Sequence, residues 1–470
     1  MKSNAKAPFL KDSFDNFRKE ACGITLDLGQ QRITSKELSN LIDFVNKKGM
    51  IRCFNEMRRG DIVNLSENRS ALHTSLRDPS PCAPYAKVVH ETLTRFCLFA
   101  EEVRNGLKRG ATGHCFTDII NVGIGGSDMG PRVVYNALRS PNPDITVHFL
   151  ASADGVTFDR VTSSLDPFKT LVVISSKSFK TQETQANAKE IIAWLEKGGV
   201  EEVDLKKHVV VVSAKPDAAE FFGLPQENFF PIWDWVGGRF SVWGATGLPI
   251  AIALGTEKFK SFLNGAHKMD EHASLTPLED NLPALMAMFA YWNCTSMDIT
   301  SYCFLPYDER LRTMVDWLQQ LEMESLGKST KPDGTPVYGR TSLTVWGGHG
   351  NESQHSFYQW LREGTAKTAI DICWCKKPGH EHKELNKVLM ANAYAQTEAL
   401  GVRNPNEPYF NVVSSLTIDE LIPERLGALM ALYEHKTTML GTLFGINAFD
   451  QPGVELGKKL AIKMYNANVE

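Results

Sequence analysis

The chain has 470 residues, of which 43% are hydrophobic and 23% are charged, a composition that is ordinary for a globular protein. Its length is too great for one simple core. Its net charge of −4 gives no general attraction to nucleic acid or to an acidic membrane surface. Nine scattered cysteines, no apolar leader in the first twenty residues and no run near the roughly 20 apolar residues of a membrane span predict a cytoplasmic protein without a disulfide framework.

The first part of the chain, residues 1–110, is expected to be mainly helical, with polar faces that pack on larger lobes. From Thr117 onward, short apolar runs alternate with helical patterns, which is typical of a parallel sheet covered on both faces. The predicted strands in this part are "DIINVGIGG", a run that ends in glycines, and then "ITVHFLAS", "TLVVISS" and "HVVVVSA"; the helix "TQANAKEIIAWLEKGG" also ends in glycines.

The alternation resumes in the second half with the strands "SYCFLPY", "TSLTVWG" and "AIDICWCK" and with helices that include "ERLRTMVDWLQQLEMESL". We therefore predict an α/β protein with two tandem doubly wound parallel-sheet sandwiches. The expected regions are an N-terminal helical segment (1–110), a first domain (111–260), a second domain (261–445) and a C-terminal segment with an amphipathic helix (446–470).

The glycine-rich stretch "NVGIGGSDMGP" follows the first predicted strand. It is not a dinucleotide fingerprint, because Asp128 stands where G-x-G-x-x-G requires its third glycine. Gly125 and Gly126 permit a close backbone approach to a ligand, and Ser127 precedes a helix. The alternative is an ordinary helix cap after a tight turn.

The stretch "VISSKSFKTQET" places hydroxyl groups and lysines between a strand and a helix. The free N–H groups and the dipole of a helix N-terminus favour a phosphate, and hydroxyls supply further donors. The Walker pattern is absent, so a compact phosphomonoester fits better than a triphosphate. The alternative is a loop capped by serine and threonine.

Several longer motifs resemble the glucose-6-phosphate isomerase family and occur in the family's order. They are "DWVGGRFSVWGATG", "FDQPGVELGKK", "SSKSFKTQET", "QQLEMESLGK", "QHSFYQ", "AQTEAL" and "LYEHK". The resemblance implies two sugar-isomerase domains, a homodimer, no metal or other cofactor, and interconversion of glucose 6-phosphate and fructose 6-phosphate in glycolysis and gluconeogenesis.

The resemblance also implies a role for each matching residue. Glu324 would be the base that moves a proton between C1 and C2, and Arg239 the cation beside the enediolate. His355 and Lys458 would open the sugar ring, with His355 supplied to the neighbouring subunit. The implied substrate-binding residues are Gly126, Ser127, Ser176, Lys177, Ser178, Thr181, Gln320 and Gln451.

The residue types suit this chemistry. A partly buried glutamate gains basicity, and an arginine keeps its proton while it stabilises an oxyanion. A histidine titrates in the range that ring opening needs. Taken singly, Glu324, His355 and Lys458 would be ordinary helix, cap and surface residues, and only the joint motif match favours catalysis.

The chain departs from the family in the loop before His355, where "GGHGNESQH" replaces a "GEPGTNGQH"-like run, and at Lys180 in the threonine-rich phosphate loop. The pair His380 and His382 lacks the rest of a metal-ligand set. Two alternatives stay open, namely a phosphosugar-binding regulator without turnover and an isomerase of another sugar phosphate.

Overall fold

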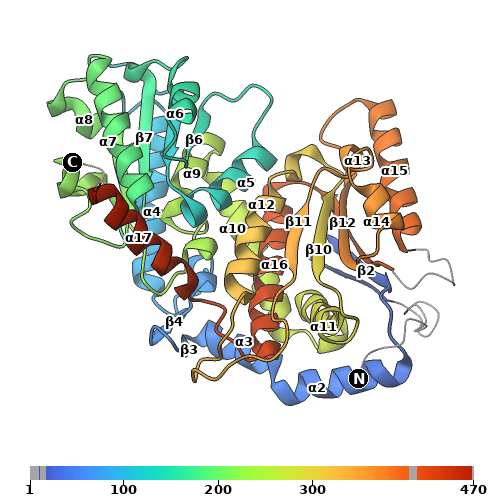
Figure 1. Ribbon diagram of the computed structural model, residues 1–470. Helices are drawn as coiled ribbons and strands as arrows, with labels where there is room; N and C mark the ends of the chain where they lie inside the picture. Colours follow the sequence, from blue (N-terminus) through green and yellow to red (C-terminus); the bar gives the residue numbers. More distant parts are fainter. Residues whose placement is uncertain (1–9, 11–16, 402–409, 468–470) are drawn as a thin grey trace. The chain divides into compact units, whose positions relative to one another are not determined.

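A computed structural model describes residues 10, 17–401 and 410–467 (Figure 1). The chain divides into two compact units, each assembled from separate stretches of sequence. Unit 1 comprises the described parts of Met1–Leu65, Asn136–Leu138 and Lys260–Ala448, and unit 2 those of Ser66–Tyr135, Arg139–Phe259 and Phe449–Glu470. No helix of the described residues is long and apolar enough to cross a membrane.

Unit 2 is built on a five-stranded parallel sheet with the order β6-β5-β7-β8-β9. Its strands are short runs of apolar residues because both faces of the sheet are covered. The strands are β5 (Asp118–Val122), β6 (Thr146–Leu150), β7 (Thr170–Ser175), β8 (Val209–Ser213) and β9 (Phe229–Pro231).

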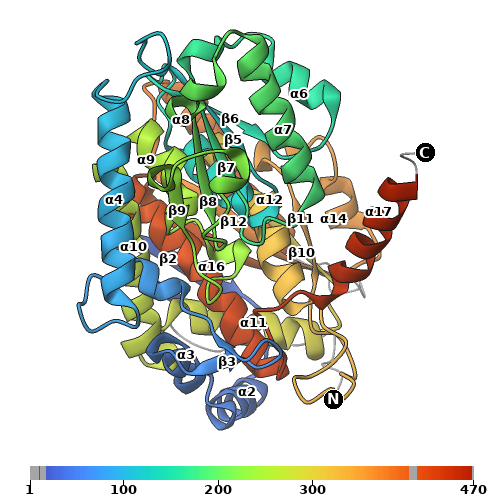
Figure 2. The same ribbon diagram turned by 90° about the vertical axis from the view of Figure 1, so that its left-hand side faces the viewer.

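Helices cover both faces of this sheet. In Figure 2 the sheet lies between α4 and α9 on one side and α6 and α7 on the other. The core beside α7 is formed by alternate residues of β5 and β7, such as Ile120 and Ile174, packed against Ile191 of α7. The helices of unit 2 are α4 (Ala86–Arg104), α6 (Gly155–Thr162), α7 (Gln182–Lys197), α8 (Leu205–His208), α9 (Leu248–Leu254) and α17 (Glu455–Ala467).

Unit 1 contains a six-stranded sheet with the order β1-β2-β13-β12-β10-β11. Strands β13, β12, β10 and β11 are parallel, whereas β2 pairs antiparallel with both β13 and β1. The strands are β1 (Arg18–Ala21), β2 (Ile24–Gln30), β10 (Ser301–Pro306), β11 (Thr344–Gly347), β12 (Thr368–Lys377) and β13 (Val412–Glu420); β3 (Ile62–Asn64) and β4 (Arg69–Ser70) are shorter.

The sheet of unit 1 also lies between helices. Tyr358 of α14 and Ala393 of α15 pack against Ile370 and Ile372 of β12, while α11 and α16 lie on the other face (Figure 1). The helices are α2 (Ser35–Lys48), α3 (Met50–Arg59), α11 (Leu282–Thr295), α12 (Met314–Leu318), α13 (Gly350–Ser353), α14 (Tyr358–Glu363), α15 (Lys383–Gly401) and α16 (Pro423–Phe444). The chain passes between the units within the helices α5 (Met129–Leu138) and α10 (Thr256–Leu275), and also after Leu65 and after Ala448.

The structure confirms the predicted α/β class, with a parallel sheet in unit 2 and four parallel strands in the sheet of unit 1. It differs from the sequence analysis in two places. Strands β1 and β2 lie in the part expected to be mainly helical, and they extend the sheet of unit 1. The single helix expected over "ERLRTMVDWLQQLEMESL" is instead α12 followed by a wider, π-helical segment, Gln319–Glu324.

Candidate active site

The two loops that the sequence analysis selected for anion binding lie at the switch point of the unit 2 sheet. The chain runs from β5 to β6 on one side and then returns to β7 on the other side of β5. Ligands of doubly wound α/β proteins bind at the carboxyl ends of the strands at such a point. The glycine turn, residues 123–127, follows β5, and the hydroxyl turn, residues 176–181, follows β7. The two strand ends lie side by side, since a Cβ added at Gly123 would lie 3.1 Å from the carbonyl oxygen of Ser175.

The hydroxyl turn begins in the core and ends at the N-terminus of α7. Ser176 is buried, and its hydroxyl accepts a 3.2 Å hydrogen bond from the amide of Phe179, a residue with a positive φ of 56°. Ser178 is exposed. Thr181 is the N-cap of α7 but its hydroxyl does not bond to that helix. The hydrogen bond between Phe179 and Ser176 thus shapes the backbone of the turn, and the Thr181 hydroxyl makes no capping hydrogen bond to α7.

Lys177 joins this turn to the segment before Arg239. Its ammonium group donates hydrogen bonds to the carbonyl oxygens of Asp234 and Val236, at 2.9 and 2.8 Å. Burial lowers the pKa of this ammonium group below its usual value. Lys177 therefore connects the hydroxyl turn to the segment that precedes Arg239. The sequence analysis did not assign this role to it.

Gly126 and Arg239 also lie close together. A Cβ at Gly126 would lie 2.1 Å from the carbonyl carbon and oxygen of Gly238 and 2.7 Å from the amide nitrogen of Arg239. Only glycine leaves room for this contact between two backbones. Ser127, the next residue, is half-buried in the same turn.

The guanidinium group of Arg239 is buried and directed at the start of the C-terminal segment. Its Nη1 donates to the side-chain oxygen of Gln451 at 3.0 Å, and its Nη2 donates to the carbonyl oxygen of Asp450 at 3.2 Å. Two of the predicted site residues, Arg239 and Gln451, are thus hydrogen-bonded to each other.

Lys458 is exposed on α17, a helix with no buried residue. Its ammonium group pairs with the carboxylate of Glu455, 2.8 Å away, one turn earlier on the same helix. Among the described residues, no hydrogen bond or ion pair joins Lys458 to another predicted site residue of unit 2.

Unit 1 contains the remaining candidates, beginning with Gln320 and Glu324 in the π-helical segment. Both are half-buried, and one helical turn separates them. The Oε1 atom of Gln320 is buried without a hydrogen-bond partner among the described residues. The ammonium group of Lys328 donates at 2.7 Å to the backbone carbonyl of Glu324, which fixes the end of the segment.

His355 lies after β11, just beyond α13, and its side chain is exposed. Its amide donates at 3.0 Å to the carbonyl of Glu352, so the loop that departs from the family pattern is part of the backbone that supports this histidine. An exposed imidazole can be reached by a ligand or by another chain.

A group of side chains from this loop and from the segment after β10 could hold a metal ion. The ligand atoms of Glu309, His349 and Glu352 lie within 4.8 Å of one another, and burial lowers the pKa of His349, which keeps its imidazole neutral. However, the guanidinium group of Arg312 lies 2.8 Å from Glu309 and 2.6 Å from Glu352. Both carboxylates are therefore already neutralised by an arginine.

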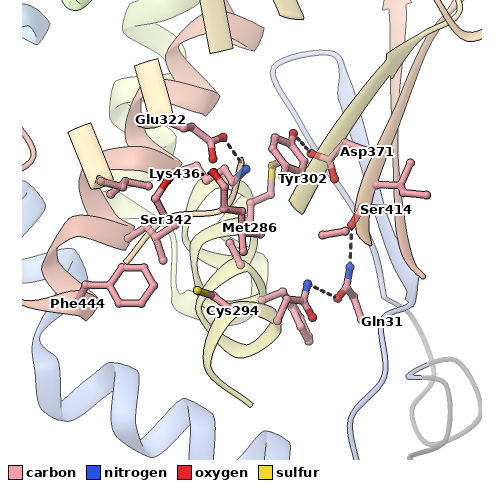
Figure 3. A pocket seen from close by; sticks show the side chains of 18 of the residues that line it. Gln31, Met286, Cys294, Tyr302, Glu322, Ser342, Asp371, Ser414, Lys436 and Phe444 are labelled. Carbon is pink, nitrogen blue, oxygen red and sulfur yellow. Dashed lines mark hydrogen bonds and ion pairs between the residues drawn. The ribbon is translucent and has the colours of Figure 1, made fainter. Parts of the chain in front are cut away.

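A polar network behind the π-helical segment was missed by the sequence analysis (Figure 3). Glu322 points into the core and pairs with Lys436 of α16 at 2.7 Å, while Tyr302 and Tyr433 donate to Asp371 at 2.6 and 3.0 Å. Burial raises the pKa of Glu322 and, more strongly, those of the two tyrosine hydroxyls, which therefore stay protonated as donors. The available signal was a lysine in the middle of the apolar helix α16.

These features define an α/β protein. In unit 2, two loops suited to anion binding lie at the switch point of the sheet, and in unit 1 the carboxylate of Glu324 is half-buried on a helical turn. The sequence model of the family described as phosphoglucose isomerase matches residues 27–469. The chain is 40% identical over 458 residues to a glucose-6-phosphate isomerase of Paraburkholderia phytofirmans, covering 93% of this chain and 85% of the relative. It is 41% identical over 458 residues to one of Burkholderia ambifaria, with the same coverage.

Among solved structures, a glucose-6-phosphate isomerase from Chlamydia trachomatis superposes with a TM-score of 0.85 at 30% identity, covering 97% of this chain and 90% of that one. A hypothetical protein from Thermus thermophilus superposes with a TM-score of 0.69 at 29% identity, covering 93% and 99% of the two chains. The chain therefore belongs to the phosphoglucose isomerase family.

Proposed function

We propose that this chain is an enzyme that interconverts glucose 6-phosphate and fructose 6-phosphate, a step of glycolysis and gluconeogenesis. The observation that carries this conclusion is the continuous family match over residues 27–469, which includes every candidate catalytic residue. The curated relatives at about 40% identity bear the name glucose-6-phosphate isomerase.

In the proposed reaction the hydroxyl turn of unit 2 binds the phosphate group, with Ser176, Ser178 and Thr181 as donors. Lys177 assists by holding the turn, because its ammonium group already bonds to two backbone carbonyls. Hydroxyl and amide donors at the N-terminus of α7 stabilise a dianion without a metal ion.

Isomerisation follows ring opening. His355 and Lys458 assist the transfer of a proton from O1 to O5, which breaks the C1–O5 bond and leaves an aldehyde at C1. The carboxylate of Glu324 then removes the C2 proton, and the electron pair moves through C1 to O1 to form an enediolate. Arg239 stabilises the charge of this intermediate. A proton shifts between the two oxygens, and Glu324 returns its proton to C1.

The proposal includes a homodimer in the cytoplasm in which His355 serves the site of the neighbouring subunit. The exposure of the His355 side chain supports this assignment, since a catalytic group used by another chain must be accessible. The domain assignment that we propose keeps 111–260 as the phosphate-binding domain and 261–445 as the domain with the catalytic glutamate and histidine, flanked by 1–110 and 446–470.

The test is a coupled assay of the purified protein with fructose 6-phosphate, in which glucose 6-phosphate is detected by its oxidation. We expect turnover that a chelator does not change. Glu324→Gln should lower kcat by several orders of magnitude and stop exchange of the C2 hydrogen with D₂O, whereas Glu190→Gln on the exposed surface of α7 should be active. Binding without turnover in the wild type would instead indicate a regulator, and faster turnover of mannose 6-phosphate would indicate another isomerase.

A further inference from the structure

The helical segment that carries Glu324 has an unusual width. Residues Gln319–Glu324 form a π-helical turn directly after the α-helical turn Met314–Leu318. Such turns are rare and are frequently found at functional sites. One extra residue in a turn rotates everything after it by about 100° relative to an α-helix, so the direction of Glu324 depends on whether this turn keeps its width.

The side chains of the segment divide between three surroundings. Gln319 donates to the carbonyl oxygen of Val345 in β11 at 3.2 Å, and the Val345 amide contacts the sulfur of Met323 at 3.4 Å. Glu322 points into the core, while Gln320 and Glu324 stay half-buried. Gln319 and Met323 contact β11 and Glu322 points into the core, so Gln320 and Glu324 lie at the boundary between the core and the surface.

The core contact is an ion pair that is almost completely buried. The side chains of Glu322 and Lys436 are only 5% and 4% exposed, and their charged atoms lie 2.7 Å apart. The Lys436 ammonium group also lies 4.0 Å from the ring centre of Tyr302. Figure 3 shows the two side chains directed at each other. Both line a cavity of about 30 Å³, enough for one or two water molecules, that Asp371 and Ser414 also line.

Stability alone does not explain this pair. Two buried charges lose their hydration, and an apolar pair of the same volume is often as stable or more stable. The pair does determine the direction of Glu322. Among the described residues, the ammonium group of Lys436 on the long helix α16 has its hydrogen-bond acceptor in Glu322, and only an inward Glu322 can reach it. An inward Glu322 in a π-helical turn leaves Gln320 and Glu324 on the outer side of the segment.

We propose that Lys436 is a positioning residue for the isomerisation, which acts through Glu322 to hold the π-helical turn in the register that presents Glu324 to the sugar. This inference rests on the proposed function of Glu324 as the base. Lys436 is not assigned contact with the substrate.

The test compares the wild type with the double variant Glu322→Met/Lys436→Met, which removes both charges and keeps flexible side chains of similar length in the core. We expect kcat to fall about tenfold to hundredfold with KM within threefold, since a misplaced base loses rate but not phosphate binding. Amide hydrogens of residues 319–327 should exchange at least tenfold faster than in the wild type, while those of α16 keep their protection.

A matched control uses the other buried pair of α16, where His435 lies 2.7 Å from Asp270 of α10 with both side chains fully buried. His435→Gln should lower the thermal midpoint and leave kcat per folded molecule within about twofold. The single variant Lys436→Met is a harsher test, because it leaves Glu322 buried without a partner; if it does not fold, the double variant decides.

The outcomes separate the two hypotheses. An active wild type, an inactive Glu324→Gln and a double variant with wild-type kcat and unchanged amide exchange would overturn the positioning role and keep the proposed function. An inactive wild type would overturn the proposed function and the positioning role with it. A loss of kcat in the double variant together with faster exchange in 319–327 supports the inference.

Discussion

At the scale of single residues, Gly126 shows how a missing side chain shapes the site. Its α-carbon faces the backbone of Gly238 and Arg239 so closely that a methyl group would lie 2.1 Å from the Gly238 carbonyl. The sequence predicted a close backbone approach at this glycine, but it suggested a ligand as the neighbour. The structure places another loop there, and this loop carries Arg239.

We therefore expect Gly126→Ala to displace the Arg239 loop. Overpacking against backbone costs about 1–3 kcal/mol and should lower the thermal midpoint by several degrees. Activity should fall at least tenfold, because the guanidinium group moves. Gly155→Ala, at the exposed start of α6 where nothing lies within 4 Å of the new methyl group, is the control and should change neither quantity. A fully active Gly126→Ala enzyme would contradict the role of this contact.

A second prediction at this scale concerns His208, which is fully buried in unit 2. Its Nδ1 lies 2.9 Å from the carbonyl of Thr170, and its Nε2 accepts a 2.8 Å hydrogen bond from the amide of Ala111. Burial lowers the pKa of this imidazole in the folded protein. The unfolded chain, with an ordinary pKa near 6.5, then binds more protons, so stability is complete above pH 6.5 and is lost as the pH falls.

Thermal midpoints of wild type and His208→Gln at pH 7.5 and pH 5.5 check this sign. The wild type should lose more on acidification than the variant, which has no imidazole at this position. His272 also has a pKa lowered by burial, so the wild type and the variant share that contribution and the difference between them isolates His208. Equal losses in both proteins would contradict the assignment.

At the scale of elements, the hydroxyl turn is the feature that the sequence located best. An apolar strand, a run of hydroxyls and a helical pattern are all local signals, and β7, the turn and α7 follow them. If the turn binds the phosphate, Ser176→Ala/Thr181→Ala should mainly raise KM. Each lost charge-assisted bond weakens binding by about 1.5–3 kcal/mol, which is about tenfold or more per site.

Steady-state kinetics of this double variant measure the effect. Ser164→Ala, on an exposed loop after α6, is a suitable control and should keep the wild-type KM. An unchanged KM in the double variant would show that the phosphate binds in a different turn. A loss of kcat alone would point to a structural role of Ser176, whose hydroxyl accepts the Phe179 amide.

Other elements could not be predicted because their signals are not local. Strand β1 is polar, and the turn to β2 is formed by Cys22 and Gly23, both with positive φ. Two-residue hairpin turns of this kind usually contain Asn-Gly or Asp-Gly. Because a cysteine occupies the first position here, the sequence did not indicate the turn. The π-helical turn was missed since its residues are good helix formers, while its partner Lys436 lies 114 residues after Glu322.

At the scale of the whole molecule, the sequence predicted two α/β bodies, and the chain divides into two compact units, each assembled from separate stretches of sequence. The described residues up to and including Leu65 belong to unit 1, and the described residues from Phe449 onward belong to unit 2. A composition profile along the chain cannot detect such exchanges, because they depend on which distant strand or helix a segment contacts. The strand β2, which pairs with β13, is an example.

The last prediction concerns assembly and follows from the family resemblance and the exposed His355. In a dimer with two-fold symmetry both sites are equivalent. Glu324→Gln and His355→Asn should each be nearly inactive alone.

If the two variants are mixed equally, unfolded and refolded, about half of the dimers should be heterodimers by random pairing. With His355 shared between subunits, one site of each heterodimer has both wild-type residues, so activity should recover to about a quarter of the wild-type value. If His355 acts within its own chain, every heterodimer site lacks one residue and no activity returns. Differently tagged chains confirm that heterodimers form, and their presence without recovered activity would assign the complete site to one subunit.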